Sequence, residues 1–216
     1  EKQKQFIADA SHELKTPLSV IVASSEALED NPKEKKWLTN IKEEANRMNL
    51  LITDLLELAK SEQKADSLKD GDLSKVVELS TLTFEGKAFE SNIKIDYDID
   101  SNIKMKMSEN SIKQLVEILL DNAVKHSEEK STINIALKED NNQIELLVKN
   151  KGEAIPKGEE EKIFERFYRV DKSRNRDSNR YGLGLAIAKN IVLNHNGKIS
   201  AYSIDGTTIF KVLFKK

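Results

Sequence analysis

Residues 6–18, FIADASHELKTPL, carry the clearest fold signal in the chain. The apolar residues of this stretch recur every four positions, which marks one face of an α-helix; they are Phe6, Ala10, Leu14 and Leu18. His12 falls outside this stripe and is expected to face solvent. Pro17 interrupts the pattern, where it removes a backbone hydrogen bond to the carbonyl of Glu13 and bends a helix. The stretch therefore predicts an amphipathic helix that bends beside an exposed histidine.

A second helical stripe follows after a polar break. Its apolar residues are spaced by three or four positions: Trp37, Ile41, Ala45, Met48, Ile52, Leu55 and Ala59. The break over residues 29–33 contains a proline and predicts a turn, so residues 1–65 should form an antiparallel helical hairpin. Two helices cannot enclose so wide an apolar stripe, whereas a four-helix bundle made by two chains would. The alternative is that the hairpin packs on the rest of its own chain.

The composition narrows the possible functions. The chain has 216 residues, enough for one large domain or two small ones. Its net charge of -2 provides no basic field for nucleic acid, so we expect no nucleic-acid partner. Cysteine is absent, which excludes disulfides and thiolate metal sites. The apolar runs are short, so we expect neither a signal peptide nor membrane contact in this sequence.

The rest of the chain mixes two periodicities. Residues 61–72 are polar and lose the helical pattern, and we expect a linker over 66–72. Within 73–216, helices are expected over 73–89, 108–126 (with Ser108 as N-cap) and 183–194, and strands over 93–99, 132–138, 143–149, 198–203 and 207–214. This order predicts an α+β two-layer sandwich, with a mixed sheet and helices on one face.

His12 is a candidate acceptor for a phosphoryl group. A neutral imidazole is a good nucleophile near about pH 7. Glu13 is placed to hold one ring N–H, which leaves the other nitrogen free to attack, and Thr16 lies one helical turn away on the same face. The alternatives are an ordinary exposed histidine and an ordinary helix-face threonine.

The segment around His12 resembles the H-box of sensor histidine kinases, whose phosphoacceptor lies in a dimerisation hairpin. The resemblance implies that His12 is phosphorylated, that Glu13 is its acid–base partner, and that Thr16 positions water when the same core dephosphorylates its partner. It also implies a Bergerat ATP-binding sandwich of the gyrase and Hsp90 type after the hairpin, with ATP and Mg²⁺. The partners implied are a second copy and the receiver domain of a response regulator. The chain would then be the cytoplasmic portion of a bacterial membrane sensor.

Residues 114–126, QLVEILLDNAVKH, resemble the N-box of the same family. The chain has no P-loop, so phosphates must be held in another way. The resemblance assigns Asn122 to Mg²⁺, Lys125 to phosphate and His126 to the adenine side. The alternatives are a polar residue at a helix end for Asn122 and, for His126, a histidine favoured by the helix dipole.

Three positions in the N-box and the G1 box depart from the family pattern. Ile118 stands where a second asparagine is common, and Glu117 beside it is a further candidate for the metal. Residues 148–156, VKNKGEAIP, resemble the G1 box Asp-x-Gly-x-Gly, with Asn150 in place of the Asp and Ala154 in place of the second Gly. Asparagine keeps an acceptor and gains a donor, so adenine binding is expected to persist.

The remaining candidates surround the same pocket. Gly152 and Ile155 belong to the G1 segment, and Gly152 lets backbone approach the base. Residues 163–169, IFERFYR, resemble the F-box, where Phe164 and Phe167 are expected to anchor a lid over about residues 156–181. Arg169 belongs to a cationic stretch that either binds phosphate or is a solvated loop. The G2 box resembles a phosphate cradle at the start of a helix, and its candidate residues are Gly182, Leu183, Gly184 and Leu185. Thr208 belongs to the closing hairpin.

The function that these motifs imply together is ATP-dependent autophosphorylation of His12 in a two-component system, with transfer to an aspartate of a response regulator and a phosphatase activity on that regulator. One alternative is a signalling scaffold that binds nucleotide weakly and chiefly dephosphorylates, which Ile118, Asn150 and Ala154 suggest. Another is a mechanical ATPase, which the intact segment around His12 opposes. His195 is expected to be a structural residue at a helix end.

Overall fold

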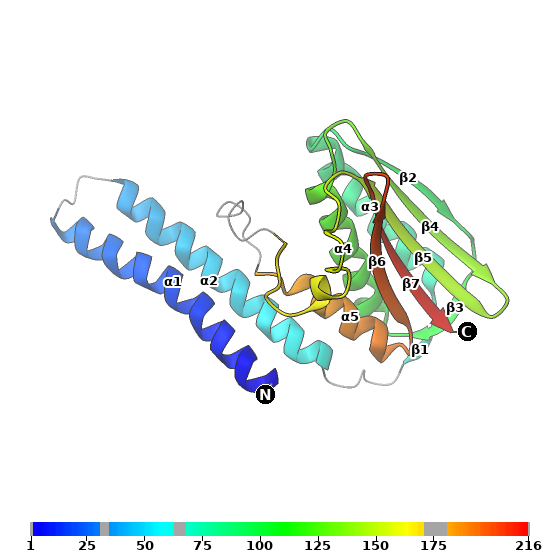
Figure 1. Ribbon diagram of the computed structural model, residues 1–216, viewed down its shortest axis with the longest axis horizontal. Helices are drawn as coiled ribbons and strands as arrows, with labels where there is room; N and C mark the ends of the chain where they lie inside the picture. The colour runs from blue at the N-terminus through cyan, green and yellow to red at the C-terminus, as the bar shows by residue number, and fades with distance from the viewer. Residues whose placement is uncertain (1, 31–34, 63–67, 171–180, 216) are drawn as a thin grey trace. The chain divides into compact units, whose positions relative to one another are not determined.

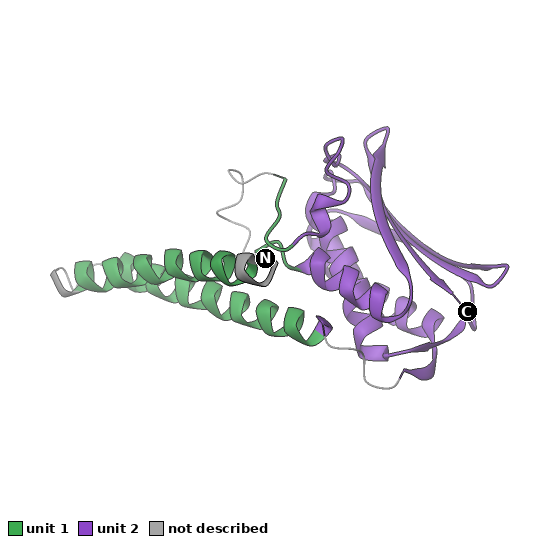
Figure 2. Cartoon of the chain, turned by 60° about the horizontal axis from the view of Figure 1, so that its bottom comes forward, with its two compact units in different colours: residues 1–60, 166–183 green, residues 61–165, 184–216 purple. Residues whose placement is uncertain are grey.

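The computed structural model describes residues 2–30, 35–62, 68–170 and 181–215. The chain divides into two compact units (Figure 2). The first contains Glu1–Lys60 and Arg166–Leu183, and the second contains Ser61–Glu165 and Gly184–Lys216. Most of the predicted turn over 29–33 and the arginine-rich part of the predicted lid lie outside the described residues.

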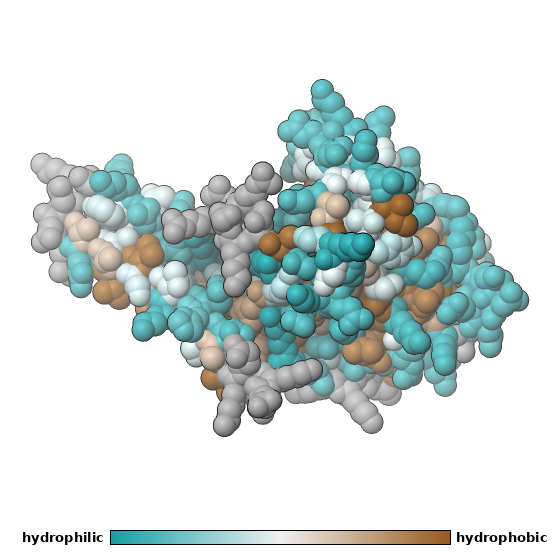
Figure 3. Space-filling model, viewed as in Figure 1, coloured by the Kyte–Doolittle hydropathy of each residue, from teal (hydrophilic) through white to brown (hydrophobic). Residues whose placement is uncertain are grey.

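The first unit is dominated by two long helices, α1 (Lys2–Asp30) and α2 (Lys35–Glu62), which lie side by side (Figure 1). Pro17 is buried inside α1, and the helix is continuous across it. Large apolar side chains remain exposed on both helices, as the brown surface in Figure 3 shows. Leu18 on α1 is 50% exposed and Ile52 on α2 is 45% exposed, although both belong to the predicted stripes. The hairpin thus leaves apolar surface that its own two helices do not cover.

The second unit contains a mixed five-stranded sheet with the order β2-β4-β5-β7-β6. Its strands are β2 (Lys94–Ile99), β4 (Thr132–Asp140), β5 (Gln143–Lys151), β7 (Thr207–Lys215) and β6 (Lys198–Ile204). β2 and β4 are parallel, and the other neighbours are antiparallel. Asn141 and Asn142 join β4 to β5 with φ values of 43° and 73°, the left-handed backbone that a two-residue hairpin requires.

Three helices cover one face of this sheet (Figure 1): α3 (Leu73–Glu90), α4 (Glu109–His126) and α5 (Gly184–Asn194). Alternate residues of β5 are buried, and the series ends at Asn150. The apolar side of α4 is fully buried and includes Leu115, Leu119 and Ala123. The predicted two-layer α+β sandwich is therefore confirmed.

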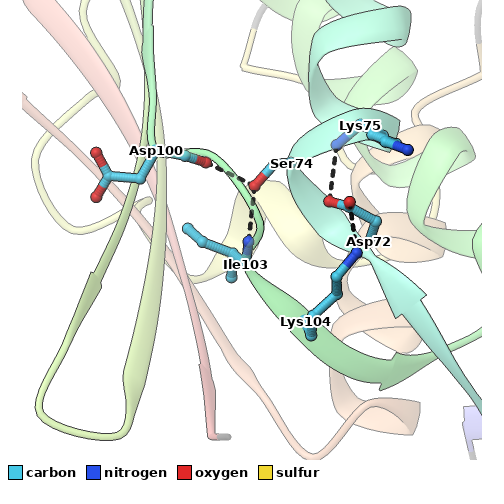
Figure 4. Close-up of polar contacts among 6 residues, drawn as sticks. All are labelled: Asp72, Ser74, Lys75, Asp100, Ile103 and Lys104. Atoms are coloured by element: carbon cyan, nitrogen blue, oxygen red, sulfur yellow. Dashed lines mark hydrogen bonds and ion pairs between the residues drawn. The ribbon is translucent and has the colours of Figure 1, made fainter.

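The expected linker over 66–72 is wrong at its end. Lys69–Asp72 form β1, which pairs antiparallel with β3 (Lys104–Met107) in a two-stranded sheet. Figure 4 shows how Asp72 secures this corner: its carboxylate accepts hydrogen bonds from the backbone N–H of Lys75 and, at 2.6 Å, from Lys104 Nζ. The bond from Lys104 holds the pKa of Asp72 below its usual range. The strand was not predicted because Lys69–Asp72 contains no apolar side chain and so shows no apolar alternation.

Ser108 occupies the N-cap position of α4, as predicted, although its side chain makes no capping hydrogen bond. The stretch between β5 and α5 contains the 3-10 helix η1 (Lys162–Phe164), which was not predicted.

His195 ties the beginning of α4 to the end of α5. Its Nδ1 lies 2.7 Å from the carbonyl oxygen of Ile191, and its Nε2 accepts a hydrogen bond from the backbone N–H of Ser108 at 3.0 Å. These two bonds require a neutral ring with the proton on Nδ1. The side chain is only 4% exposed, and burial lowers its pKa. The predicted structural role of His195 is confirmed.

We expect the stability of the protein to fall as the pH is lowered through about 6.5. The unfolded chain binds a proton at His195 there, whereas the folded protein resists it, so protonation favours unfolding. Burial and the charge of Lys125 also lower the pKa of His126, so this residue adds to the loss of stability as the pH falls. His195→Gln should lower the free energy of unfolding by about 1–3 kcal/mol near neutral pH and flatten its pH dependence. Urea unfolding followed by circular dichroism at about pH 7.5 and about pH 5.5 measures both effects; an unchanged pH dependence in the variant would contradict the assignment.

Candidate functional site

The predicted acceptor histidine lies on the surface of α1. His12, Glu13 and Thr16 are all exposed. The Thr16 hydroxyl donates a hydrogen bond of 3.3 Å to the carbonyl oxygen of His12, one turn back along the helix. Pro17 has no N–H to offer the carbonyl of Glu13. The imidazole is thus accessible, and the threonine hydroxyl lies within one helical turn of it.

The same unit contains part of the predicted lid. The Phe167 ring lies 6.1 Å from the Phe6 ring of α1, and the Arg166 guanidinium lies 4.9 Å from that ring. The Tyr181 hydroxyl donates a hydrogen bond of 3.0 Å to the carbonyl oxygen of Arg47 on α2. Burial, followed by the carboxylate of Glu13, raises the pKa of this phenol. Phe167 was predicted to anchor a lid in the core, but it is half-buried and its aromatic partner is Phe6 of α1.

Gly182 brings the two ends of this segment together. Its φ is 71°, and a Cβ there would lie 2.6 Å from the carbonyl oxygen of Tyr168. The backbone N–H of Phe167 donates to the carbonyl oxygen of Gly182 at 3.1 Å. Arg169, predicted to contact phosphate, is half-buried in this unit, and Leu183 is fully buried. Only glycine fits the conformation and the close approach at position 182.

The polar residues of α4 separate into two groups. Asp121 is buried and forms an ion pair with Lys87 of α3, which links α4 to α3. Asn122 is half-buried and Lys125 is exposed. These two share a helix face with Ile118, because the spacings are four and three residues. A Cβ at Gly184 would lie 3.5 Å from Ile118, so this face of α4 meets the N-terminus of α5.

The N-terminus of α5 begins at Gly184, followed by the half-buried Leu185. The first backbone N–H groups of a helix lack intrahelical partners, and with the helix dipole they favour an anion. Phe164 of η1 is buried and packs edge-on against Phe210, with ring centroids 6.4 Å apart, as expected for an anchor. The ammonium group of Lys189 lies 5.8 Å from the Phe164 ring. Lys189 was not among the predicted site residues, although it lies beside η1.

Asn150 lies near the end of β5 on the face that the helices cover. Its side chain is 1% exposed, and neither its amide oxygen nor its amide nitrogen has a hydrogen-bond partner. The residue opposite on β7 is Thr208. Its hydroxyl donates to the carbonyl oxygen of Glu153 at 3.1 Å and lies 2.8 Å from Ser203 Oγ. A buried polar group without a partner costs about 1–3 kcal/mol, so an amide in this state fits a ligand with complementary polar atoms.

The loop after β5 closes onto the C-terminal end of α4. A Cβ at Gly152 would lie 2.0 Å from the carbonyl oxygen of His126, and the backbone N–H of Glu153 donates to that oxygen at 3.3 Å. The backbone N–H of Ile155 donates to Ser203 Oγ at 2.9 Å. The structure therefore brings Asn150, Gly152, Ile155, His126 and Thr208 together. Ser203 was missed because its role depends on the pairing of β6 with β7.

His126 is a neutral imidazole in this environment near about pH 7. Burial lowers its pKa most, Lys125 lowers it further, and Glu153, whose carboxylate lies 3.7 Å from Nδ1, opposes the shift. A neutral ring can donate from one nitrogen and accept at the other. The group suits an uncharged partner such as a nucleobase better than a phosphate.

The donor set on α4 suits a magnesium ion that is held mainly by phosphate. Among the described residues, no group of three or more His, Asp or Glu side chains is placed to hold a metal. Asn122 and Glu117 are five residues apart, so their side chains point about 140° apart around the helix. Mg²⁺ usually takes one or two protein oxygens together with substrate phosphates and water. Asn122 alone fits that requirement.

Comparison with known proteins agrees with this architecture. Residues 2–64 match the His Kinase A (phospho-acceptor) domain, and residues 107–216 match the histidine kinase-, DNA gyrase B-, and HSP90-like ATPase family. Sensor protein DltS of Streptococcus agalactiae serotype V is 38% identical over 203 residues, which are 93% of this chain and 51% of DltS. Sensor histidine kinase YkoH of Bacillus subtilis is 39% identical over 218 residues, which are 95% of this chain and 46% of YkoH.

A solved structure shows the same fold over nearly the whole chain. Histidine kinase ThkA in complex with response regulator protein TrrA superposes with a TM-score of 0.78 at 23% identity, covering 98% of this chain and 61% of that one. The chain spans about half the length of the curated relatives it matches. Among the described residues, no helix has the length and apolar character needed to cross a bilayer.

The fold combines a phosphoacceptor hairpin with a nucleotide-binding sandwich of two layers. The chain belongs to the histidine kinase-, DNA gyrase B-, and HSP90-like ATPase family, and the phospho-acceptor domain that precedes this part makes it the core of a sensor histidine kinase.

Gly152→Ala should weaken nucleotide binding at least about tenfold, because its methyl group would displace the loop from the carbonyl of His126. It should also lower the free energy of unfolding by about 1–3 kcal/mol, since neither backbone segment can yield freely. Calorimetric titration with ADP and thermal unfolding measure the two effects.

Gly86→Ala on α3 is the matched control. A Cβ there meets nothing within 4 Å, so the change should raise stability by about 0.5–1 kcal/mol and leave ADP affinity unchanged. Equal behaviour of the two variants would contradict the role of the Gly152 contact.

Proposed function

We propose that the chain is an ATP-dependent protein-histidine kinase that phosphorylates His12 and passes the phosphoryl group to an aspartate of a response regulator. The proposal depends on one observation: the same chain contains an exposed imidazole in a phospho-acceptor helix and a sandwich of the ATPase family. The ThkA–TrrA complex, in which a kinase of this fold is bound to a response regulator, supports the choice of partner.

The proposed roles in nucleotide binding follow the position of each residue. Asn150 and His126 bind the base through neutral polar groups, and Gly152 allows the loop to approach it. The cationic side chains of Lys125 and Arg169 balance phosphate charge. The remaining proposed ligands are Ile155 and Thr208 beside Asn150, Gly184 and Leu185 at the start of α5, and Gly182 and Leu183, which precede α5 in the chain.

Asn122 is the proposed protein ligand of Mg²⁺, with the phosphates and water completing its coordination. The bound ion would neutralise charge that develops on the transferring phosphoryl group. Glu117 stays a prediction as a second ligand. Its carboxylate lies 3.8 Å from Lys113 on the preceding turn, so binding a metal would require it to leave that pair.

Phosphorylation of His12 requires a lone pair on one ring nitrogen and a hydrogen-bonded proton on the other. The unprotonated ring nitrogen attacks the γ-phosphorus, a P–N bond forms, and the bond to the bridging oxygen breaks as ADP leaves. Glu13 accepts a hydrogen bond from the other ring N–H and takes up that proton as positive charge develops on the imidazole. Alignment and charge stabilisation dominate phosphoryl transfer, and the exposed position of His12 leaves room for an in-line approach.

We also propose that two copies associate through the hairpin. Leu18 and Ile52 belong to the apolar stripes yet remain half-exposed, and a four-helix bundle would cover such surface. Because relatives are about twice as long, the whole protein is proposed to be a membrane sensor in which this core is the cytoplasmic portion.

Incubation with γ-labelled ATP should place label on the wild-type protein in an acid-labile, base-stable form, as a phosphohistidine requires. His12→Ala should abolish it while the affinity for ADP stays unchanged. Ser11→Ala, which removes only a hydroxyl that donates to the carbonyl oxygen of Ile7, should be labelled normally. Undiminished label in His12→Ala would refute the acceptor, and absence of label in the wild type would favour the weakly binding scaffold.

Thr16→Ala should retain autophosphorylation within about twofold but lose at least about tenfold in the rate at which a phosphorylated regulator is dephosphorylated, because the hydroxyl that orients water is removed. Thr39→Ala on α2 is a matched control, since its hydroxyl makes the same bond to the carbonyl four residues back. Release of phosphate from the regulator measures the rate. Equal loss in both variants would assign the effect to helix structure.

A further inference from the structure

Asn150 has an unusual hydrogen-bonding state. Among the residues that the structure describes, it alone has two buried side-chain polar atoms without a hydrogen-bond partner. One of these atoms is an acceptor and the other a donor. The site therefore offers a ligand both kinds of hydrogen bond from a single side chain.

The neighbours of Asn150 are committed to one another. Thr208, which faces it across the strand pair, bonds Glu153 and Ser203. Ser203 in turn accepts the backbone N–H of Ile155. These bonds hold the polar groups around Asn150 in place and leave the amide of Asn150 unbound. Because no protein bond fixes which amide atom points which way, turning the amide by 180° breaks no hydrogen bond.

The length of α4 between Ile118 and His126 indicates which part of a nucleotide Asn150 meets. Ile118 lies at the N-terminus of α5, the anion-binding end of the site. His126 lies eight residues further along the helix, about 12 Å away, where its carbonyl contacts the loop at Gly152. Asn150 precedes this loop by two residues. It therefore lies beside His126, at the end of the site remote from the N-terminus of α5, and this end is where the base is expected.

The two purine types differ in the order of donor and acceptor on this edge. A 6-aminopurine presents an N6–H donor beside the N1 acceptor, and a 6-oxopurine presents an O6 acceptor beside an N1–H donor. An amide matches the first in one orientation and the second after the turn. A carboxylate has only acceptors, so it matches N6–H and repels O6.

We propose that the nucleotide site binds 6-oxopurine nucleotides as well as adenine nucleotides, with Asn150 as the residue that determines this specificity. The proposal rests on the proposed function, because it requires that the site bind a nucleotide with its base at Asn150. It extends the substrate class from ATP to purine nucleotides with either group at position 6.

Titration of the full chain with ADP and with IDP tests the proposal. Inosine is the probe because it differs from guanosine by lacking the 2-amino group, so its affinity reports position 6 without that extra bulk. IDP should bind the wild type within about 30-fold of ADP. Asn150→Asp should increase the preference for ADP over IDP at least about 30-fold, because the donor to O6 is lost and a buried carboxylate faces that oxygen.

Asn134→Asp makes the same chemical change at an exposed position on β4 and should leave the ratio unchanged. Discrimination against IDP by more than about 30-fold in the wild type, or an unaltered ratio in Asn150→Asp, would overturn the proposal. If Asn150→Asp does not fold, as circular dichroism would show, the wild-type ratio decides alone. Binding of neither nucleotide would instead refute the proposed nucleotide site, so the two failures are distinguishable.

Discussion

The nucleotide-binding unit depends on the carbonyl oxygen of His126 at the end of α4. The loop after β5 donates a backbone N–H to this oxygen and passes so close to it that position 152 admits only glycine. This contact joins the helix layer to the sheet at the point where the candidate base site lies. The other end of α4 is fixed by His195, which accepts a hydrogen bond from the N–H of Ser108. With both ends fastened, the face of α4 that bears Asn122 and Lys125 is held in place beneath α5.

The two chemical halves of the protein require opposite environments. A nucleophile must be reached by its substrate, and His12 is exposed on a long helix. A base-recognition group gains selectivity when water is excluded, and Asn150 is among the most buried polar residues described. The hairpin accordingly exposes apolar and polar residues alike, whereas the sandwich completes its own core.

The sequence predicted the long elements well, because periodicity reports which face is buried. The stripes on α1 and α2, the alternation in β4, β5 and β7, and the apolar side of α4 all gave the correct element. What could not be predicted depends on contacts between distant residues. β1 has no apolar side chain and is defined by its pairing with β3, and the bond between Asp72 and Lys104 joins the two strands. The contacts of Ser203 follow from the strand register. The different roles of the neighbours Asp121 and Asn122 follow from the ion pair that only Asp121 makes with Lys87.

The register of β5 places Asn150 between two lysines, Lys149 and Lys151. Successive residues of a strand face opposite sides of the sheet, so a shift of one position would replace the neutral amide in the pocket with an ammonium group. A change in the number of residues in this strand therefore alters which side chains face the helices, whereas a substitution alters one side chain only. An insertion or deletion between the Asn141-Asn142 turn and Gly152 would alter ligand choice even if the sheet still formed. In this sense strand length, as much as residue identity, is an inherited determinant of what the protein recognises.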